Sequence, residues 1–215
     1  MPRAGPGMRV LIFDLDGTLA ETRLDIAAAA NHALRVVGLA EIAVDRITTF
    51  VGEGAARLIE RCLGARRDLF APAMAAWTAH YEAHLLDTTI LYEGVAATLA
   101  RLSVPLAVLS NKPKAMTHAI LEGLGIARHF AASLGGDSLP SKKPDPSGVR
   151  EILRRTGAAR AVLIGDTPVD VETARAAQIP CWGAAYGFAG RAALEMAGAD
   201  SVFDRFEEIE KLETA

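Results

Sequence analysis

Residues 8–18 read MRVLIFDLDGT, a short apolar run that ends in two aspartates, a glycine and a threonine. The run is partly β-branched and stops at a polar turn, which predicts a buried β-strand over residues 8–13. Asp14 and Asp16 follow this strand two residues apart, so their carboxylates share one face if the extended chain continues that far. Two carboxylates this close need a cation or a proton. A strand-end turn rich in aspartate is the simpler alternative, and the rest of the chain weighs against it.

Short apolar runs of the same kind recur along the chain. They predict strands over residues 106–109, 130–134, 161–164 and 181–185, with a possible edge strand over 201–203. Helical patterns separate these runs and cover residues 113–122, 146–155 and 168–177. Uniformly apolar strands are typical of sheets that are covered on both faces. The alternation predicts an α/β fold, a doubly wound, Rossmann-like parallel sheet with right-handed crossovers.

Residues 14–105 separate the first expected strand from the second, which is far more than an ordinary crossover needs. Helical patterns fill most of this stretch, over residues 23–37, 45–50, 55–63 and 68–86. Helices inserted there would lie above the carboxyl edge of the sheet, where open α/β folds bind ligands. We therefore predict a catalytic core of residues 1–18 and 92–215 and a helical cap domain of residues 19–91. Residues 1–7, with two prolines and two glycines, are expected to be a loose tail.

Composition excludes several classes of protein. The 215 residues carry 23 basic and 26 acidic side chains, so the strong basic excess of nucleic-acid binders is missing. Two cysteines, Cys62 and Cys181, are too few for a disulfide scaffold and fit a reducing compartment. No apolar run approaches the roughly 20 residues that span a bilayer. We expect a cytoplasmic globular protein that binds neither nucleic acid nor a membrane.

Polar side chains also follow the other expected strands. Ser110 and Asn111 come after the second strand and suit phosphate oxygens, although both are common helix caps as well. Lys143 lies in a proline-rich loop, where an exposed lysine pair is the simpler reading. The segment GDTPVD places Asp166 at a strand end and Asp170 one helical turn later. With the two aspartates after the first strand, this makes four converging carboxylates, which suit Mg²⁺.

In this order and across the whole chain, DLDGT, the Ser-Asn strand end, the Lys143 loop and GDTPVD resemble the haloacid dehalogenase-like phosphohydrolases. The closer resemblance is to the bacterial phosphoglycolate phosphatase group. Three stretches carry it: LAVLSNKPKAMTHAILEGLGIARHF (106–130), GGDSLPSKKPDP (135–146) and, in the expected cap, VGEGAARLIERCL (51–63).

The resemblance implies a role for each of the matching carboxylates. Asp14 would be the nucleophile and form an aspartyl-phosphate. Asp16 would protonate the leaving alkoxide and then activate water. Mg²⁺ would be held by the Asp14 carboxylate, the Asp16 backbone carbonyl and Asp166, while Asp170 would hold metal-bound waters or orient Lys143. Asp16 also argues against dehalogenation, because a halide leaves without a proton.

The matching polar and basic residues would bind the phosphoryl group. Ser110 and Asn111 would hold its oxygens, and Lys143 would offset its charge together with that of the nucleophile. In the cap, the loop residue Glu53 and the helix residue Arg57 are candidates to face the site, and Arg57 could bind a substrate carboxylate. An acid at Glu53 departs from the neutral residue common in the group, and it would repel a dianionic substrate unless it pairs with a cation.

Two other features are expected to be structural. His80 and His84 have the i, i+4 spacing of zinc ligands, but there is no third ligand nearby and no HExxH motif. The two cysteines are expected to be small buried side chains.

These observations predict a Mg²⁺-dependent phosphomonoesterase that acts on a small-molecule phosphate ester, foremost 2-phosphoglycolate, as a monomer or homodimer. A pyrophosphatase, a nucleotidase and a sugar-phosphate phosphatase are the alternatives within the class, with a phosphoglucomutase behind them. The alternative from another class is a phosphate-responsive regulatory module, whose phospho-aspartate persists because no acid or base lies beside it. Asp16 and the large insertion argue against that module.

Overall fold

The computed structural model describes residues 8–214, so the expected tail at residues 1–7 lies outside the described part. Its main sheet has six strands in the order β5-β4-β1-β6-β7-β8. Every neighbouring pair of these strands is parallel. The strands are β1 (Arg9–Phe13), β4 (Leu106–Leu109), β5 (Phe130–Leu134), β6 (Arg160–Gly165), β7 (Cys181–Ala184) and β8 (Ser201–Phe203). The predicted doubly wound parallel sheet is confirmed, including the edge strand at residues 201–203.

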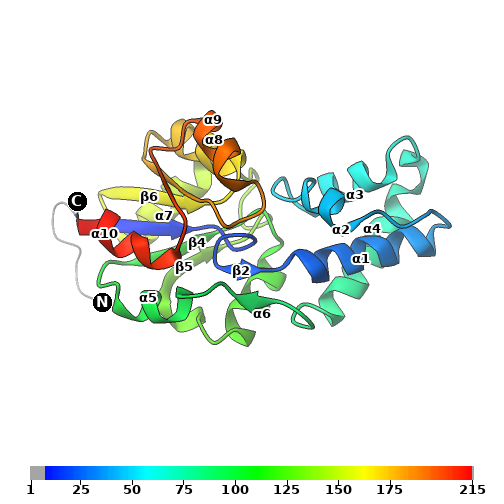
Figure 1. The fold of residues 1–215 in the computed structure, drawn as a ribbon, viewed down its shortest axis with the longest axis horizontal. Coiled ribbons are helices and arrows are strands. Elements are labelled where there is room, and N and C mark those ends of the chain that lie inside the picture. Colours follow the sequence, from blue (N-terminus) through cyan, green and yellow to red (C-terminus); the bar gives the residue numbers. More distant parts are fainter. Residues whose placement is uncertain (1–7, 215) are drawn as a thin grey trace.

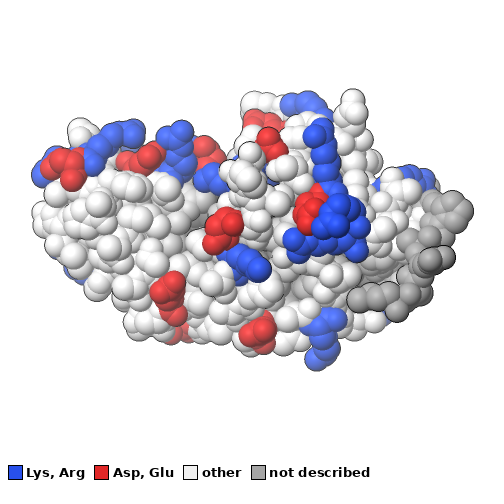
Figure 2. Space-filling view, turned by 180° about the vertical axis from the view of Figure 1, so that it is seen from behind, with Lys and Arg blue, Asp and Glu red and all other residues white. Residues whose placement is uncertain are grey.

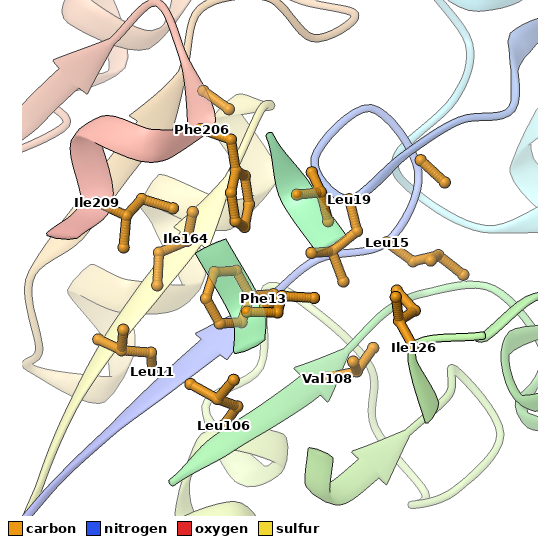
Figure 3. Packing of buried hydrophobic residues seen from close by; sticks show 14 of the residues in the cluster. Leu11, Phe13, Leu15, Leu19, Leu106, Val108, Ile126, Ile164, Phe206 and Ile209 are labelled. Carbon is orange, nitrogen blue, oxygen red and sulfur yellow. The ribbon is translucent and has the colours of Figure 1, made fainter. Parts of the chain in front are cut away.

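Helices cover both faces of this sheet (Figure 1). Alternate residues of β1 point to opposite faces. Phe13 belongs to one apolar cluster, and its ring lies 5.7 Å from that of Phe206 between centroids; Figure 3 shows this packing. Ile12 belongs to a second cluster with Val149 and Val171 on the other face. The core helices are α5 (Val95–Arg101), α6 (Lys114–Gly123), α7 (Ser147–Thr156), α8 (Pro168–Ala177), α9 (Gly190–Ala197) and α10 (Ile209–Thr214), with short 3-10 turns η2 (Ala127–His129) and η3 (Phe206–Glu208). Both faces of the sheet are therefore buried, as the apolar runs predicted.

Most of the stretch between β1 and β4 folds into helices that pack on one another and form a third apolar cluster, to which Met116 of the core helix α6 also belongs. These inserted helices are α1 (Arg23–Val36), α2 (Val44–Thr48), α3 (Ala55–Leu63) and α4 (Phe70–Ala83), with the 3-10 turn η1 (Arg67–Leu69) before α4. They extend away from the core beyond the arrowhead end of β1 (Figure 1). The two chain segments that connect them to the core pair as a small antiparallel sheet of β2 (Ala20–Glu21) and β3 (Ile90–Leu91).

The fourth inserted helix is shorter than the pattern of residues 68–86 predicted, because the chain turns back toward β3 after Ala83. Asp25 of α1 stabilises that return. Its carboxylate is buried and accepts hydrogen bonds from the backbone N–H and the hydroxyl of both Thr88 and Thr89. A contact between residues more than sixty positions apart leaves no local signal in the sequence.

On the molecular face shown in Figure 2, basic and acidic side chains are interspersed rather than segregated. Within residues 8–214, none of the helices combines the length and the hydrophobicity that crossing a membrane requires.

Candidate active site

The carboxyl ends of β1, β4 and β6 meet at the point where the strand order reverses, because β1 lies between the other two. Asp14 follows β1, Ser110 follows β4, and Asp166 follows β6. The extended strand ends at Phe13, so Asp14 and Asp16 do not continue β1; both nevertheless line one cavity. The crevice at such a reversal is where open α/β folds place ligands.

Three carboxylates form a tight buried cluster. Oxygens of Asp14, Asp166 and Asp170 lie within 4.8 Å of one another, and Asp166 and Asp170 are fully buried. Lys143 places its ammonium 3.0 Å from Asp14 Oδ1 and 2.7 Å from Asp170 Oδ1. Asp170 Oδ2 also accepts from the N–H and the hydroxyl of Thr167 at the start of α8. One ammonium therefore faces three carboxylates.

The shortage of positive charge affects the pKa values of the groups in the cluster. Burial raises the pKa of Asp14 to about 6, against the opposing effect of Lys143. Burial, together with the charges of Asp170 and Asp14, also raises the pKa of Asp166 well above its ordinary value. Burial alone would lower the pKa of Lys143, but the charges of Asp14 and Asp170 outweigh it and raise that pKa. Buried carboxylates that resist ionisation are the donor set that a hard divalent cation relieves, so the residues present fit Mg²⁺.

Glycines make room for these aspartates. A Cβ on Gly17, whose φ is +80°, would lie 2.1 Å from Asp166 Oδ2. A Cβ on Gly187 would lie 2.2 Å from the Cβ of Asp166 and 2.5 Å from the backbone oxygen of Gly17. Asp166 itself accepts from the hydroxyl of Thr18 and the N–H of Phe188, both neutral donors. The close approach of backbone to carboxylate explains why glycine stands at both positions.

Asp16 has different partners from Asp14. Its two oxygens lie 2.7 and 3.0 Å from Lys112 Nζ, and Oδ1 also accepts from the hydroxyl of Thr22 at 2.7 Å. The Lys112 ammonium donates in addition to the Tyr81 hydroxyl at 2.8 Å. Burial alone would lower the pKa of Lys112, but the charge of Asp16 and then that of Tyr81 raise it above its ordinary value. The two aspartates of DLDGT are therefore separated into distinct environments.

Asn111 connects the core to the inserted helices. Its amide nitrogen donates to the carbonyls of Gly52 and Lys143, each at 2.9 Å, so both N–H groups are used inside the protein. Its Oδ1 is buried and has no hydrogen-bond partner among residues 8–214. Ser110 lines the cavity directly, and its Oγ accepts from the backbone N–H of Lys112.

The cavity above the aspartates has a volume of about 500 Å³, including open solvent. The core contributes its polar side, and the inserted helices contribute an apolar wall with Ile26, Val51, Leu58 and Trp77. Trp77 is 3 % exposed, and its Nε1 is a buried donor that meets no acceptor in the described part of the chain. Gly54 and Ala55, at the N-terminal end of α3, also line the cavity.

The two residues expected to reach the site from the insertion lie outside this lining. Glu53 forms an ion pair with Arg61 of α3. This pair supplies the cation without which Glu53 was expected to repel an anionic substrate. Arg57 is paired with Glu60 at 2.7 Å, and 58 % of its side chain is exposed. The loop is instead tied to the core through its backbone, because Lys142 Nζ donates to the Glu53 carbonyl.

The histidine pair belongs to a stack of rings on the inserted helices. His32 of α1 lies against His80 with ring centroids 4.3 Å apart, and His84 lies 4.4 Å from His80. Within residues 8–214, the one group of three metal-ligand side chains that converge is the aspartate cluster. Both cysteines are buried and unpaired.

Several site residues were missed in the sequence. Lys112 stands inside the Ser-Asn-Lys-Pro strand end, so its position after β4 was a usable signal. Thr22, Trp77 and Tyr81 had none, because they reach the site through the packing of α1 and α4 against the core.

Comparison with known proteins identifies the family to which this sequence and fold belong. The family model described as haloacid dehalogenase-like hydrolase matches residues 11–184. A phosphoglycolate phosphatase of Photobacterium profundum is 32% identical over 94% of both chains. A phosphoglycolate phosphatase of Rhodospirillum rubrum is 37% identical over 92% of this chain and 88% of its own. The crystal structure of a protein described as a predicted phosphoglycolate phosphatase from Haemophilus somnus superposes with a TM-score of 0.91 at 30% identity, over 96% of this chain and 98% of that one.

The matched segment runs from Leu11 within β1 to Ala184 at the end of β7, and it includes the clustered aspartates, Lys143 and the inserted helices. With relatives above 30% identity over nearly the whole length, the chain belongs to the haloacid dehalogenase-like hydrolases.

Proposed function

We propose that the protein is a Mg²⁺-dependent phosphatase that cleaves 2-phosphoglycolate through an aspartyl-phosphate on Asp14. The single observation that carries the chemistry is the buried carboxylate cluster facing one ammonium, at the sheet edge where ligands bind. The broader class, phosphoric monoester hydrolase, is that of the relatives named above. We also propose that residues 19–91 form a cap domain over a core of residues 1–18 and 92–215.

Asp14, Asp166 and the Asp16 backbone carbonyl would hold the metal ion, and the ion would neutralise charge on the phosphoryl oxygens. Lys143 neutralises part of the charge on Asp14 and on the bound phosphoryl group. Asp170 keeps that ammonium in place through its 2.7 Å contact. Ser110 offers its hydroxyl to a phosphoryl oxygen from the end of β4.

In the first half-reaction, a carboxylate oxygen of Asp14 forms a bond to phosphorus while the bond from phosphorus to the ester oxygen breaks. Asp16 gives its proton to the departing oxygen. In the second half-reaction, water attacks the phosphorus of the aspartyl-phosphate, Asp16 takes a proton from that water, and the Asp14 carboxylate and inorganic phosphate are released.

The choice of substrate rests on the wall formed by the inserted helices. That wall is apolar, and two kinds of N–H donor belong to the residues that form it: the Nε1 of Trp77, which is buried without an acceptor among residues 8–214, and the first-turn N–H groups of α3 near Ala55. The first N–H groups of a helix have no partner inside it and favour an anion. A short phosphate ester that carries a carboxylate satisfies these donors, whereas a sugar would place several hydroxyls against apolar side chains.

The test is the release of inorganic phosphate from a panel of esters with Mg²⁺ and with EDTA. The panel includes 2-phosphoglycolate, pyrophosphate, a nucleoside monophosphate and a sugar phosphate. We expect metal-dependent turnover led by 2-phosphoglycolate and abolished by Asp14→Asn, with Asp145→Asn, at an exposed aspartate, as the matched control. Preference for another ester would reject the substrate and keep the chemistry; full activity of Asp14→Asn would reject the chemistry.

A further inference from the structure

Lys112 carries a buried positive charge that has no role in the proposed catalytic steps. The Lys112 side chain is 4 % exposed and its ammonium lies 2.7 Å from Asp16 Oδ1 and 3.0 Å from Asp16 Oδ2. A buried ammonium that contacts both oxygens of a carboxylate fixes the plane of that carboxylate as well as its position. Lys112 contacts the proposed proton donor, whereas Lys143 contacts the proposed nucleophile.

The Lys112 ammonium is itself held from the inserted helices. Tyr81 of α4 is fully buried and accepts a hydrogen bond from Lys112 Nζ at 2.8 Å. The centroid of its ring lies 4.6 Å from the same nitrogen. Lys112 is anchored in the core just after β4. The contact therefore joins the two halves of the molecule at the proposed proton donor.

A second donor to Asp16 completes the arrangement. The hydroxyl of Thr22, which directly precedes α1, donates to Asp16 Oδ1 at 2.7 Å. Proton transfer to a leaving oxygen requires the acid within hydrogen-bond reach in one orientation. Three hydrogen bonds from two donors, Lys112 at a core strand end and Thr22 at the start of the insertion, supply that orientation.

We propose that Lys112 is a positioning residue for Asp16: its ammonium, held by Tyr81 of the inserted helices, orients the Asp16 carboxyl group for proton transfer to the leaving oxygen. This proposal rests on the proposed function, because the acid role of Asp16 belongs to it. Lys112 also lines the cavity, and its proposed role is to act through Asp16 rather than to bind the substrate.

The leaving group separates positioning from other roles. An alkoxide needs a proton as it departs, whereas acetate leaves acetyl phosphate as a stable anion. We would measure kcat/KM with Mg²⁺ for 2-phosphoglycolate, 2-hydroxyethyl phosphate and acetyl phosphate, because kcat/KM reports the steps up to departure of the first leaving group. The variants are Lys112→Met, Lys112→Arg and Tyr81→Phe, with Asp16→Asn as the reference for loss of the acid.

For Lys112→Met we expect kcat/KM to fall about 100-fold on both alkyl esters, at the lower end of what general-acid catalysis contributes. On acetyl phosphate we expect a change of less than about threefold, and we expect the same pattern from Asp16→Asn. Tyr81→Phe removes one hydrogen bond to the ammonium and should reduce the alkyl-ester values by about threefold to tenfold. Lys112→Arg keeps the charge and should recover part of the loss. Thermal unfolding of each variant checks that it is folded.

Three outcomes would overturn the proposal. An equal loss on all three compounds would mean a structural role. A loss confined to 2-phosphoglycolate would mean that Lys112 binds the substrate carboxylate directly. Unchanged kinetics in folded Lys112→Met would mean that Asp16 needs no such support. A wild-type protein that turns over none of the compounds would remove the proposed function, and this proposal with it, before any variant is made.

Discussion

Replacing Lys143 by methionine tests the charge balance of the aspartate cluster. The side chain of Lys143 is 1 % exposed, and those of its partners Asp14 and Asp170 are 7 % and 0 % exposed. Methionine keeps the length of the side chain and removes the ammonium. The variant leaves three buried carboxylates, Asp166 included, with no buried cation among the residues that face them in the described structure.

Removing one partner of a buried ion pair costs about 3–5 kcal/mol, because the remaining charge stays desolvated. For a chain of this size, 1 kcal/mol shifts the melting temperature by about 2–4 °C. We therefore expect Lys143→Met to melt about 6–20 °C below the wild type in EDTA at neutral pH. A divalent cation replaces the missing charge, so Mg²⁺ should stabilise the variant more than it stabilises the wild type.

The assay is differential scanning calorimetry of both proteins in EDTA and in saturating Mg²⁺. Lys142→Met is the matched control, since Lys142 is exposed and the substitution removes the same charge from the same loop. Because Lys142 also donates one exposed hydrogen bond to the Glu53 carbonyl, its loss should lower the stability by no more than about 1.5 kcal/mol, below the loss expected for Lys143→Met. Equal melting temperatures of Lys143→Met and wild type in EDTA, or an equal gain from Mg²⁺ in both, would refute the reasoning.

Three further predictions concern the same site. Because the pKa of Asp14 is raised to about 6, the folded protein binds more protons than the unfolded chain between about pH 4 and pH 6. The free energy of unfolding of the metal-free protein should therefore fall as the pH rises through that window, by up to roughly 3 kcal/mol. Urea titrations in EDTA at several pH values measure this free energy, and it should depend less on pH in Asp14→Asn. Gly187→Ala places a Cβ against Asp166 and rigid backbone, so calorimetric titration should show weakened Mg²⁺ binding. The control is Gly123→Ala, whose Cβ meets only the end of the Leu86 side chain, and it should bind Mg²⁺ as the wild type does. Trp77→Phe removes the indole N–H and keeps most of the ring. It should therefore raise KM for 2-phosphoglycolate by about tenfold or more and leave KM for 2-hydroxyethyl phosphate nearly unchanged. Equal changes in KM for both esters would contradict the donor role of Trp77.

The parallel sheet and its carboxyl edge were predictable because their signals are local. Each strand is a short apolar run, and Asp14, Ser110 and Asp166 stand directly after such runs. The packing of the sheet then brings together residues whose sequence positions are far apart. The family assignment is confirmed, while the individual roles of the site residues and the boundaries of the cap stay predictions.

The wall of the cavity was not predictable, because it depends on how α3 and α4 pack. Glu53 and Arg57 look suited to an anionic ligand by residue type, yet both are satisfied by neighbours on the insertion. Trp77 and Tyr81 look like ordinary core residues at helical spacing. In the structure, Trp77 lines the cavity and Tyr81 contacts Lys112. Residue type alone does not tell which face of a helix meets another domain.

The central claim is that Asp14 carries the phosphoryl group, and trapping it tests the claim directly. Wild type and Asp16→Asn would be mixed with acetyl phosphate and Mg²⁺, quenched in acid, digested and examined by mass spectrometry. We predict a phosphoryl adduct on the peptide that contains Asp14, more abundant in Asp16→Asn because the base for hydrolysis is missing, together with steady phosphate release by the wild type. Phosphate release without an adduct, or an adduct on another residue, would contradict the account; a lasting adduct on Asp14 of the wild type without turnover would instead indicate a phosphate-responsive regulatory module.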